Sequence, residues 1–156
     1  MAEFINTVDV LGDDVVADSL INRSVSEFKD DSVAKVGKYA FCNCQQLTSI
    51  ELPAATTILS NAFQNCTKLA RVDLPMATEI KSGAFSTCSK LNTIILRNND
   101  ICAMEYTSVM KNTPIASGTG YVYVPAALVD SYKAASNWSN YPNQIRAIED
   151  YPEICG

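Results

Sequence analysis

The chain repeats a short sequence pattern at a fixed interval. An Ala-Phe pair, followed three residues later by Cys, occurs in three copies, at Ala40-Phe41, Ala62-Phe63 and Ala84-Phe85. The interval between successive pairs is 22 residues in both cases, without insertion or deletion. An interval of this length is typical of a solenoid, in which each unit buries its apolar face only against its neighbours. The sequence therefore predicts an array of stacked units.

Each copy combines two different spacings of apolar residues. In the part Ala-Phe-x-x-Cys-x-x-Leu the apolar residues recur about every three positions, which favours a short helical turn. The part Leu-x-x-Ile-x-Leu ends with a period of two, which favours a short strand with alternate side chains pointing inward. Pro53 and Pro75 end two of these strands, because proline cannot donate a hydrogen bond to a sheet. We expect one inward column that contains Ile50, Val72, Ile94 and Val122.

The strand template extends beyond the three clear copies. Residues 24–30 precede Val36 as a degenerate first repeat, and residues 121–125 match residues 49–53 position by position. The predicted fold is therefore an α/β repeat of the leucine-rich-repeat type. It has about five short parallel strands on one face, short helical turns on the opposite face and a capping helix at the C-terminal end.

The whole chain, residues 1–156, is predicted to be one domain with a cap at each end. We divide it into an acidic N-terminal cap (1–23), the repeats (24–111), an insertion with the last strand (112–125) and a helical cap with a tail (126–156). Pro125 begins the capping helix, and Trp138, Tyr141, Ile145 and Ile148 cover the last repeat. The opening cap draws on apolar residues of the N-terminal part: Phe4, Ile5, Val8, Val10, Leu11, Val15, Val16, Leu20 and Ile21.

The six cysteines are predicted to be structural thiols. Cys44, Cys66 and Cys88 occupy the same place in successive repeats, and the 22-residue interval aligns Cys102 with Ile58 and Ile80. Stacked equivalents have parallel Cβ directions, which suits a row of buried thiols better than a disulfide. Cys42 departs from the repeat, either as an exposed thiol or through a chance substitution. Thiols of this kind indicate a reducing compartment.

Charge and hydropathy exclude several classes of partner. The net charge is −5, and residues 1–31 alone carry eight acids and two bases, a net of −6. A chain without a basic stripe is a poor ligand for nucleic acid or an anionic membrane. The acidic start serves either solubility or contact with a basic partner. The N-terminus has no cationic region and no apolar run of about 18 residues, so we expect synthesis in the cytoplasm, with virion association or release by lysis as later fates.

Two features that often carry enzyme chemistry are missing. The chain contains no histidine, which removes the usual general base and His-dependent triads. There is no glycine-rich loop before a helix that would hold a phosphate. We therefore expect no enzymatic activity, no cofactor and no functional metal.

The outward side chains of the predicted strands are the candidate binding surface, because solenoids bind partners through such extended faces. They form two columns: Glu27, Ser49, Arg71, Thr93 and Tyr121 in one, and Lys29, Glu51, Asp73, Ile95 and Tyr123 in the other. Arg and Tyr anchor many interfaces, and Ile95 adds an apolar end to a charged column. The predicted partner-binding residues are Glu51, Arg71, Asp73, Ile95, Tyr121 and Tyr123, with Asp13 and Asp14 of the acidic start. The alternative interpretation is an ordinary polar sheet face.

Residues 36–53, which read Val-Gly-Lys-Tyr-Ala-Phe-Cys-Asn-Cys-Gln-Gln-Leu-Thr-Ser-Ile-Glu-Leu-Pro, resemble the BspA-type leucine-rich repeat of bacteria. The resemblance extends over roughly residues 24–148. It implies a surface or adhesive protein, and compact members without a secretion signal are similar to proteins carried by gut bacteriophages. The family brings no catalytic residues.

Two functions follow as hypotheses. The first is a phage-encoded, non-enzymatic interaction module, a virion or tail accessory that recognises a protein or glycan on the host surface through the strand face. The second is a small intracellular inhibitor whose acidic surface occupies the basic groove of a host defence enzyme such as a nuclease. The sequence leaves the oligomeric state open.

Overall fold

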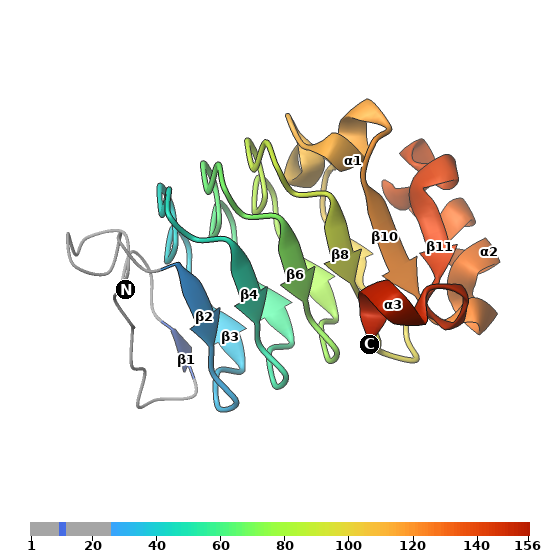
Figure 1. Cartoon of the computed structure of the whole chain (residues 1–156), viewed down its shortest axis with the longest axis horizontal. Helices are drawn as coiled ribbons and strands as arrows, with labels where there is room; N and C mark the ends of the chain where they lie inside the picture. The colour runs from blue at the N-terminus through green and yellow to red at the C-terminus, as the bar shows by residue number, and fades with distance from the viewer. Residues whose placement is uncertain (1–9, 12–25) are drawn as a thin grey trace.

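Two parallel sheets run along the molecule and enclose its core. The computed structural model describes residues 10–11 and 26–156. Figure 1 shows the coils stacked side by side, with the C-terminal helices gathered at one end. The larger sheet contains six strands in the order β11-β10-β8-β6-β4-β2, and we call its outward surface the strand face. Its strands are β2 (Glu27–Lys29), β4 (Ser49–Glu51), β6 (Arg71–Asp73), β8 (Thr93–Ile95), β10 (Tyr121–Val124) and β11 (Ile145–Ala147).

The smaller sheet lies on the opposite side of the coil. Its five strands are β1 (Val10–Leu11), β3 (Lys35–Val36), β5 (Thr57–Ile58), β7 (Glu79–Ile80) and β9 (Ala103–Met104). Each described strand is only two residues long, which is too short to show alternation in the sequence. The larger sheet contains the five predicted strands, and β11 adds a sixth.

The inward column confirms the predicted register. Ile50 pairs with Val72, Val72 with Ile94 and Ile94 with Val122, and all four side chains are fully buried. Because side chains of a strand alternate between the two faces, this register also determines which residues point outward.

Phenylalanine rings fill the centre of the coil. The Phe63 ring stacks on Phe41 and Phe85, with centroid distances of 5.0 and 5.3 Å and interplanar angles of 10° and 7°. The apolar spacing of three arises from tight turns, since the Cys44 amide donates to the Phe41 carbonyl and the Leu47 amide to the Cys44 carbonyl, both at 3.1 Å. Asn43 interrupts these turns with a φ of 62°, so the predicted helical turn is a series of tight turns instead of a regular helix.

All six cysteines are buried thiols that form no disulfide. The Cys66 thiol donates to the Phe41 carbonyl at 3.1 Å, and the Cys88 thiol donates to the Phe63 carbonyl at 3.0 Å. Burial raises the pKa of the Cys66 thiol well above its usual value of 9.0. The interpretation of Cys42 as an exposed thiol is wrong, since that residue is 8% exposed.

The alignment of Cys102 with Ile58 and Ile80 is also wrong by two residues. Ile80 pairs with Met104, so the loop after β8 contains two residues more than its counterparts. Cys102 is nevertheless fully buried in the core.

The C-terminal cap closes the open edge of β9 with side chains. The helix predicted from Pro125 to Trp138 is divided into η3 (Ala126–Leu128) and α2 (Val129–Ala134), and η4 (Trp138–Asn140) and η5 (Pro142–Gln144) follow it. The Tyr132 hydroxyl accepts a hydrogen bond from the Cys102 amide at 2.8 Å, and Trp138 Nε1 donates to the Cys102 carbonyl at 2.7 Å. Asn137 Nδ2 donates to the carbonyls of Met104 and Glu105 at 2.7 and 2.9 Å. These side chains therefore replace the backbone of a following strand.

Two short helices precede β10: η2 (Thr107–Met110) at the end of the predicted repeats, and α1 (Pro114–Ser117) in the predicted insertion. The Thr113 hydroxyl accepts a hydrogen bond from the Ala116 amide at 3.3 Å and so caps α1. Among the described residues, no helix combines the length and the apolar character needed to cross a membrane.

Most of the predicted opening cap lies outside the described residues. Val10 and Leu11 form β1, which pairs with Lys35 and Val36 of β3 and so adds a strand to the smaller sheet. Phe4, Ile5, Val8, Val15, Val16, Leu20, Ile21, Asp13 and Asp14 are outside the described residues.

Two buried weak acids where the C-terminal cap meets the last coil, Cys102 and Tyr132, predict a loss of stability at alkaline pH. Burial raises the pKa of Cys102 from 9.0 to about 12 and that of Tyr132 from 10.0 to about 12. Folding therefore favours the neutral forms, and this stabilisation is complete below pH 9 and is lost as the pH rises towards 12. Urea titrations should show the free energy of unfolding falling by roughly 1.4 kcal/mol per pH unit for each group. Cys102→Val should remove its share of this slope, and an unchanged slope would contradict the assignment.

Candidate binding surface on the strand face

The structure confirms both outward columns. The strand pairs of the larger sheet align the outward residues in two columns. One column contains Glu27, Ser49, Arg71, Thr93 and Tyr121, and the other contains Lys29, Glu51, Asp73, Ile95 and Tyr123. All six predicted residues of the strand face therefore lie on one surface. Their surroundings differ, because one half of this surface is open and the other half is covered.

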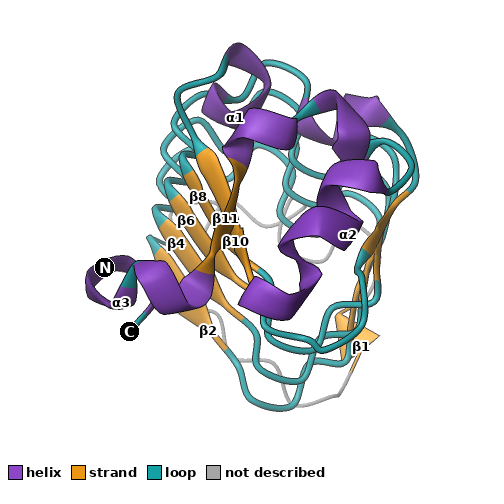
Figure 2. Ribbon diagram, turned by 90° about the vertical axis from the view of Figure 1, so that its right-hand side faces the viewer, coloured by secondary structure: helices purple, strands orange, loops and turns teal. Residues whose placement is uncertain are grey.

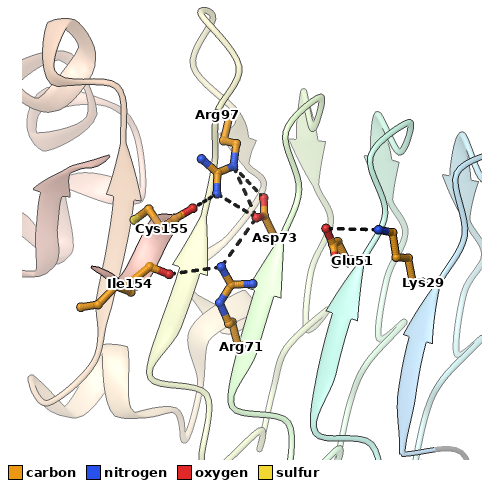
Figure 3. A network of polar contacts seen from close by, with 7 residues as sticks. All are labelled: Lys29, Glu51, Arg71, Asp73, Arg97, Ile154 and Cys155. Atoms are coloured by element: carbon orange, nitrogen blue, oxygen red, sulfur yellow. Dashed lines mark hydrogen bonds and ion pairs between the residues drawn. The ribbon is translucent and has the colours of Figure 1, made fainter. Parts of the chain in front are cut away.

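The open half lies on β2, β4 and β6. Glu27, Lys29 and Glu51 are exposed, and Ser49 and Arg71 are half-buried. Lys29 Nζ lies 3.8 Å from Glu51 Oε1, in an ion pair whose side chains are 62% and 48% exposed (Figure 3). Such an exposed pair contributes about 0–1 kcal/mol to stability, so its side chains can serve binding at little cost to the fold.

The covered half lies on β8 and β10, beneath a stretch that we call the C-terminal segment (residues 148–155). It contains η6 (Ile148–Asp150) and α3 (Pro152–Cys155). Figures 1 and 2 show α3 on the outside of the larger sheet, away from the core. Ile95 and Tyr123 are 0% and 2% exposed as a result.

A second apolar cluster forms between the C-terminal segment and the sheet. It contains Ile95, Tyr123 and Cys155, with Tyr121, Ile148, Tyr151 and Ile154 packed against them. The Tyr123 and Tyr151 rings meet edge to face, with centroids 5.4 Å apart. The prediction that Ile148 covers the last repeat is wrong, since Ile148 belongs to this second cluster. The main core holds the other three predicted cap residues, Trp138, Tyr141 and Ile145.

Asp73 is the centre of a polar network at the boundary between the two halves. It is 7% exposed, and its carboxylate accepts hydrogen bonds from Arg97 Nε at 3.1 Å and Arg97 Nη2 at 3.0 Å (Figure 3). Arg71 Nη2 lies 3.8 Å from the same carboxylate. The hydrogen bonds that Arg97 donates to Asp73 raise the pKa of Arg97, so its guanidinium stays charged throughout the accessible pH range.

Both arginines also bind the backbone of the C-terminal segment. Arg71 Nη2 donates to the Ile154 carbonyl at 3.2 Å, and Arg97 Nη2 donates to the Cys155 carbonyl (Figure 3). The Asp73 carboxylate thus positions the guanidinium groups of Arg71 and Arg97, and these groups also donate to the consecutive carbonyls of Ile154 and Cys155. Charged donors form stronger hydrogen bonds than neutral ones, which favours a well-defined position for the segment.

Arg146 is a further residue of this surface, on β11. Its guanidinium carbon lies 3.3 Å from the centroid of the Tyr121 ring and 4.7 Å from that of Tyr151. Burial raises the pKa of Tyr123 above its usual value, against an opposing effect of the nearby Arg146. The aromatic end of the strand face is therefore joined to the C-terminal segment by a cation–π contact.

Neither Arg97 nor Arg146 was predicted. Arg97 occupies the position at which the two preceding copies carry Pro53 and Pro75, and this break in the pattern was the available signal. Arg146 lies outside the repeats, where no periodicity aligns it with the strand face. Asp13 and Asp14, which were predicted to act with this surface, lie outside the described residues. Of the side chains that the structure describes, no three His, Cys, Asp or Glu residues are grouped to hold a metal ion.

Comparison with known proteins identifies the repeat. The family model described as "BspA type Leucine rich repeat region" matches residues 19–119, with six copies. The crystal structure of a leucine-rich repeat protein of T. pallidum has a similar fold, with a TM-score of 0.62 at 23% sequence identity. The similarity covers 79% of this chain and 55% of the T. pallidum protein, so the chain spans little more than half of that protein's length. No curated protein matches the sequence. Because the family model matches more than half of the 156 residues of this chain, the chain belongs to the BspA-type leucine-rich repeat family.

Proposed function

We propose that this chain is a non-enzymatic module that binds a protein partner through the strand face. Leucine-rich repeat domains generally mediate protein–protein binding, and their fold is generally an interaction fold without catalysis. The observation that carries the proposal is the open half of the strand face. There the outward side chains of three neighbouring strands carry charges of both signs and take no part in the core.

We centre the proposed interface on the open half of the strand face. The residue pattern alone predicts a centre at Arg71, Asp73, Ile95, Tyr121 and Tyr123. Ile95 and Tyr123 are buried beneath the C-terminal segment, and Asp73 is occupied by Arg97. The residues available to a partner are therefore Glu27, Lys29, Ser49, Glu51 and Arg71.

A phage-encoded origin, with a role as a virion or tail accessory that recognises a protein of the host surface, is the specific form of this proposal. It is supported by the resemblance of residues 24–148 to compact repeat proteins carried by bacteriophages. The partner is expected to present charges complementary to the mixed pattern of the open half.

One ion-pair swap tests this interface without changing the net charge. The double variant Lys29→Glu/Glu51→Lys reverses the two charges and can retain their ion pair, so its stability should change by less than about 1 kcal/mol. It inverts the charge pattern that a partner meets. We expect the affinity for a partner captured from host extract to fall by about 1–3 kcal/mol, measured by calorimetry with the purified partner.

The smaller sheet offers a matched control. Lys81 Nζ lies 3.2 Å from Glu79 Oε2 on that side of the coil. The swap Lys81→Glu/Glu79→Lys makes the same chemical change away from the strand face, and it should leave the affinity unchanged. Equal affinities for both swaps would contradict the strand-face interface.

The acidic N-terminal part supports a second candidate function, the inhibition of a host defence enzyme such as a nuclease. Residues 1–31 carry a net charge of −6, which suits a basic groove. Replacement of Asp13 and Asp14 by Asn should then abolish binding, and the strand-face swap Lys29→Glu/Glu51→Lys should be harmless. In the strand-face proposal the same replacement only slows association, and the effect disappears at high salt.

A further inference from the structure

The C-terminal segment lies on the strand face in the way that a bound peptide lies on a receptor. It buries the apolar residues Ile95 and Tyr123 under its own Tyr151 and Ile154. Two of its carbonyls, at consecutive positions, accept hydrogen bonds from Arg71 and Arg97. The covered half thus combines an apolar surface with two fixed donors, which is the composition of a site for a peptide segment.

The attachment of the segment differs from that of every strand in the larger sheet. The amides of Tyr151, Ile154, Cys155 and Gly156 donate to carbonyls within residues 148–152. By contrast, β11 pairs in parallel with β10 over three residues. The segment is held on the sheet by side-chain packing and by the two guanidinium bonds. A unit with its own internal hydrogen bonds can leave the sheet without breaking a strand ladder.

The start of the C-terminal segment is anchored to the C-terminal cap. The Glu149 carboxylate accepts a hydrogen bond from the Ala126 amide at 3.0 Å, which ties this point to the C-terminal cap. Residues 151–155 lie beyond that anchor and carry most of the contacts with the covered half. The part that can separate therefore begins at Tyr151.

We infer that the C-terminal segment is a displaceable internal ligand and that the covered half binds a partner's peptide segment in its place. The segment that fits carries an aromatic and a branched aliphatic side chain, followed by two consecutive carbonyls for Arg71 and Arg97. This inference rests on the proposed function. Arg71 connects the two, because it belongs to the open half and also binds the Ile154 carbonyl. A partner on the open half therefore reaches the edge of the segment that it displaces.

Cys155 provides a reporter for displacement in the full-length chain. It is 2% exposed in the docked segment, whereas Cys66 and Cys88 are fully buried in the core and donate hydrogen bonds there. Under native conditions, alkylation followed by mass spectrometry should show Cys155 modified about tenfold or more faster than Cys66 and Cys88. Equal rates for the three thiols would mean that the segment leaves only on global unfolding, and this would overturn the inference.

A second measurement tests the vacated surface. The probe is a synthetic peptide of residues 148–156 with Cys155→Ser, and a scrambled peptide is the control. The probe should occupy the vacated surface and so raise the alkylation rate of Cys155 in the full-length chain severalfold. Millimolar probe is needed, because the tethered segment competes for the surface at an effective concentration of about this size. An effect equal to that of the scrambled peptide would refute a peptide site.

Point variants test whether the alkylation rate of Cys155 depends on the contacts between the C-terminal segment and the covered half. Tyr151→Ala should accelerate alkylation of Cys155, and Tyr106→Ala, at a tyrosine that is 58% exposed elsewhere, should leave it unchanged. Equal rates in these two variants would contradict the docking described above. Protection that increases with chain concentration would identify a second copy as the occupant, and this would also overturn the proposal. None of these readouts depends on the charge-swap assay, so the proposed function and this inference can fail separately.

Discussion

Replacement of Phe63 by alanine is expected to lower the free energy of unfolding by about 3–5 kcal/mol. Phe63 is fully buried at the middle of a stack, with one ring on each side at 5.0 and 5.3 Å. Its removal leaves a cavity that Phe41 and Phe85 cannot fill, because the strands on both sides of the coil fix their repeats. Urea unfolding followed by far-UV circular dichroism measures the loss.

The conservative change Phe63→Leu is the control for cavity size, and it should cost clearly less than the alanine variant. In a stack of repeats each unit is stabilised chiefly by its neighbours, so a weak central repeat also separates the two ends. Trp138 is the only tryptophan, and its fluorescence reports on the C-terminal cap. In Phe63→Ala we expect fluorescence and circular dichroism to give different midpoints. A cost below about 1 kcal/mol would contradict the central role of the stack.

Trp138→Ala is expected to destabilise the chain by a similar amount, about 3–5 kcal/mol. The indole is fully buried, meets the Tyr132 ring edge to face at 5.5 Å and donates a hydrogen bond to the Cys102 carbonyl. The alanine variant loses the apolar contacts and leaves that carbonyl without its donor. Thermal and urea unfolding by circular dichroism measure the effect.

Trp138→Phe separates the two contributions. It keeps most of the apolar contact but removes the Nε1 donor, so about 1–3 kcal/mol of the loss should remain. The exposed residue Ser139 on the same short helix is a matched site, and Ser139→Ala should be close to neutral. Full stability in Trp138→Phe would show that the hydrogen bond to the Cys102 carbonyl contributes nothing.

Features set by the period could be predicted from the sequence. Ile50, Val72, Ile94 and Val122 follow from strand alternation, and the same register places Lys29 beside Glu51. Where an insertion breaks the 22-residue period, the predicted alignment is wrong. Cys102 was misaligned because the loop before it contains two additional residues, and Met104 takes the expected position.

Covering of the strand face could not be predicted in this way. Arg71 and Ile154 are 83 residues apart in the chain, and no repeat relates them. The apolar residues Ile148, Tyr151 and Ile154 of the C-terminal segment recur every three positions, which favours helical turns but does not indicate which surface these turns contact. The outward position of Ile95 fits a covering element as well as a binding interface, and the repeat pattern does not distinguish the two.

The Asn137, Trp138 and Tyr132 side chains on the edge of β9 have a consequence for assembly. An open sheet edge is a template for fibre growth, because any extended chain can add to its free amide and carbonyl groups. At β9 these groups are already bound to side chains whose positions are fixed by a packed cap. A second molecule cannot continue the smaller sheet from this end without unfolding the cap. The cap thus ends the smaller sheet within one chain and blocks its continuation by a second chain at β9.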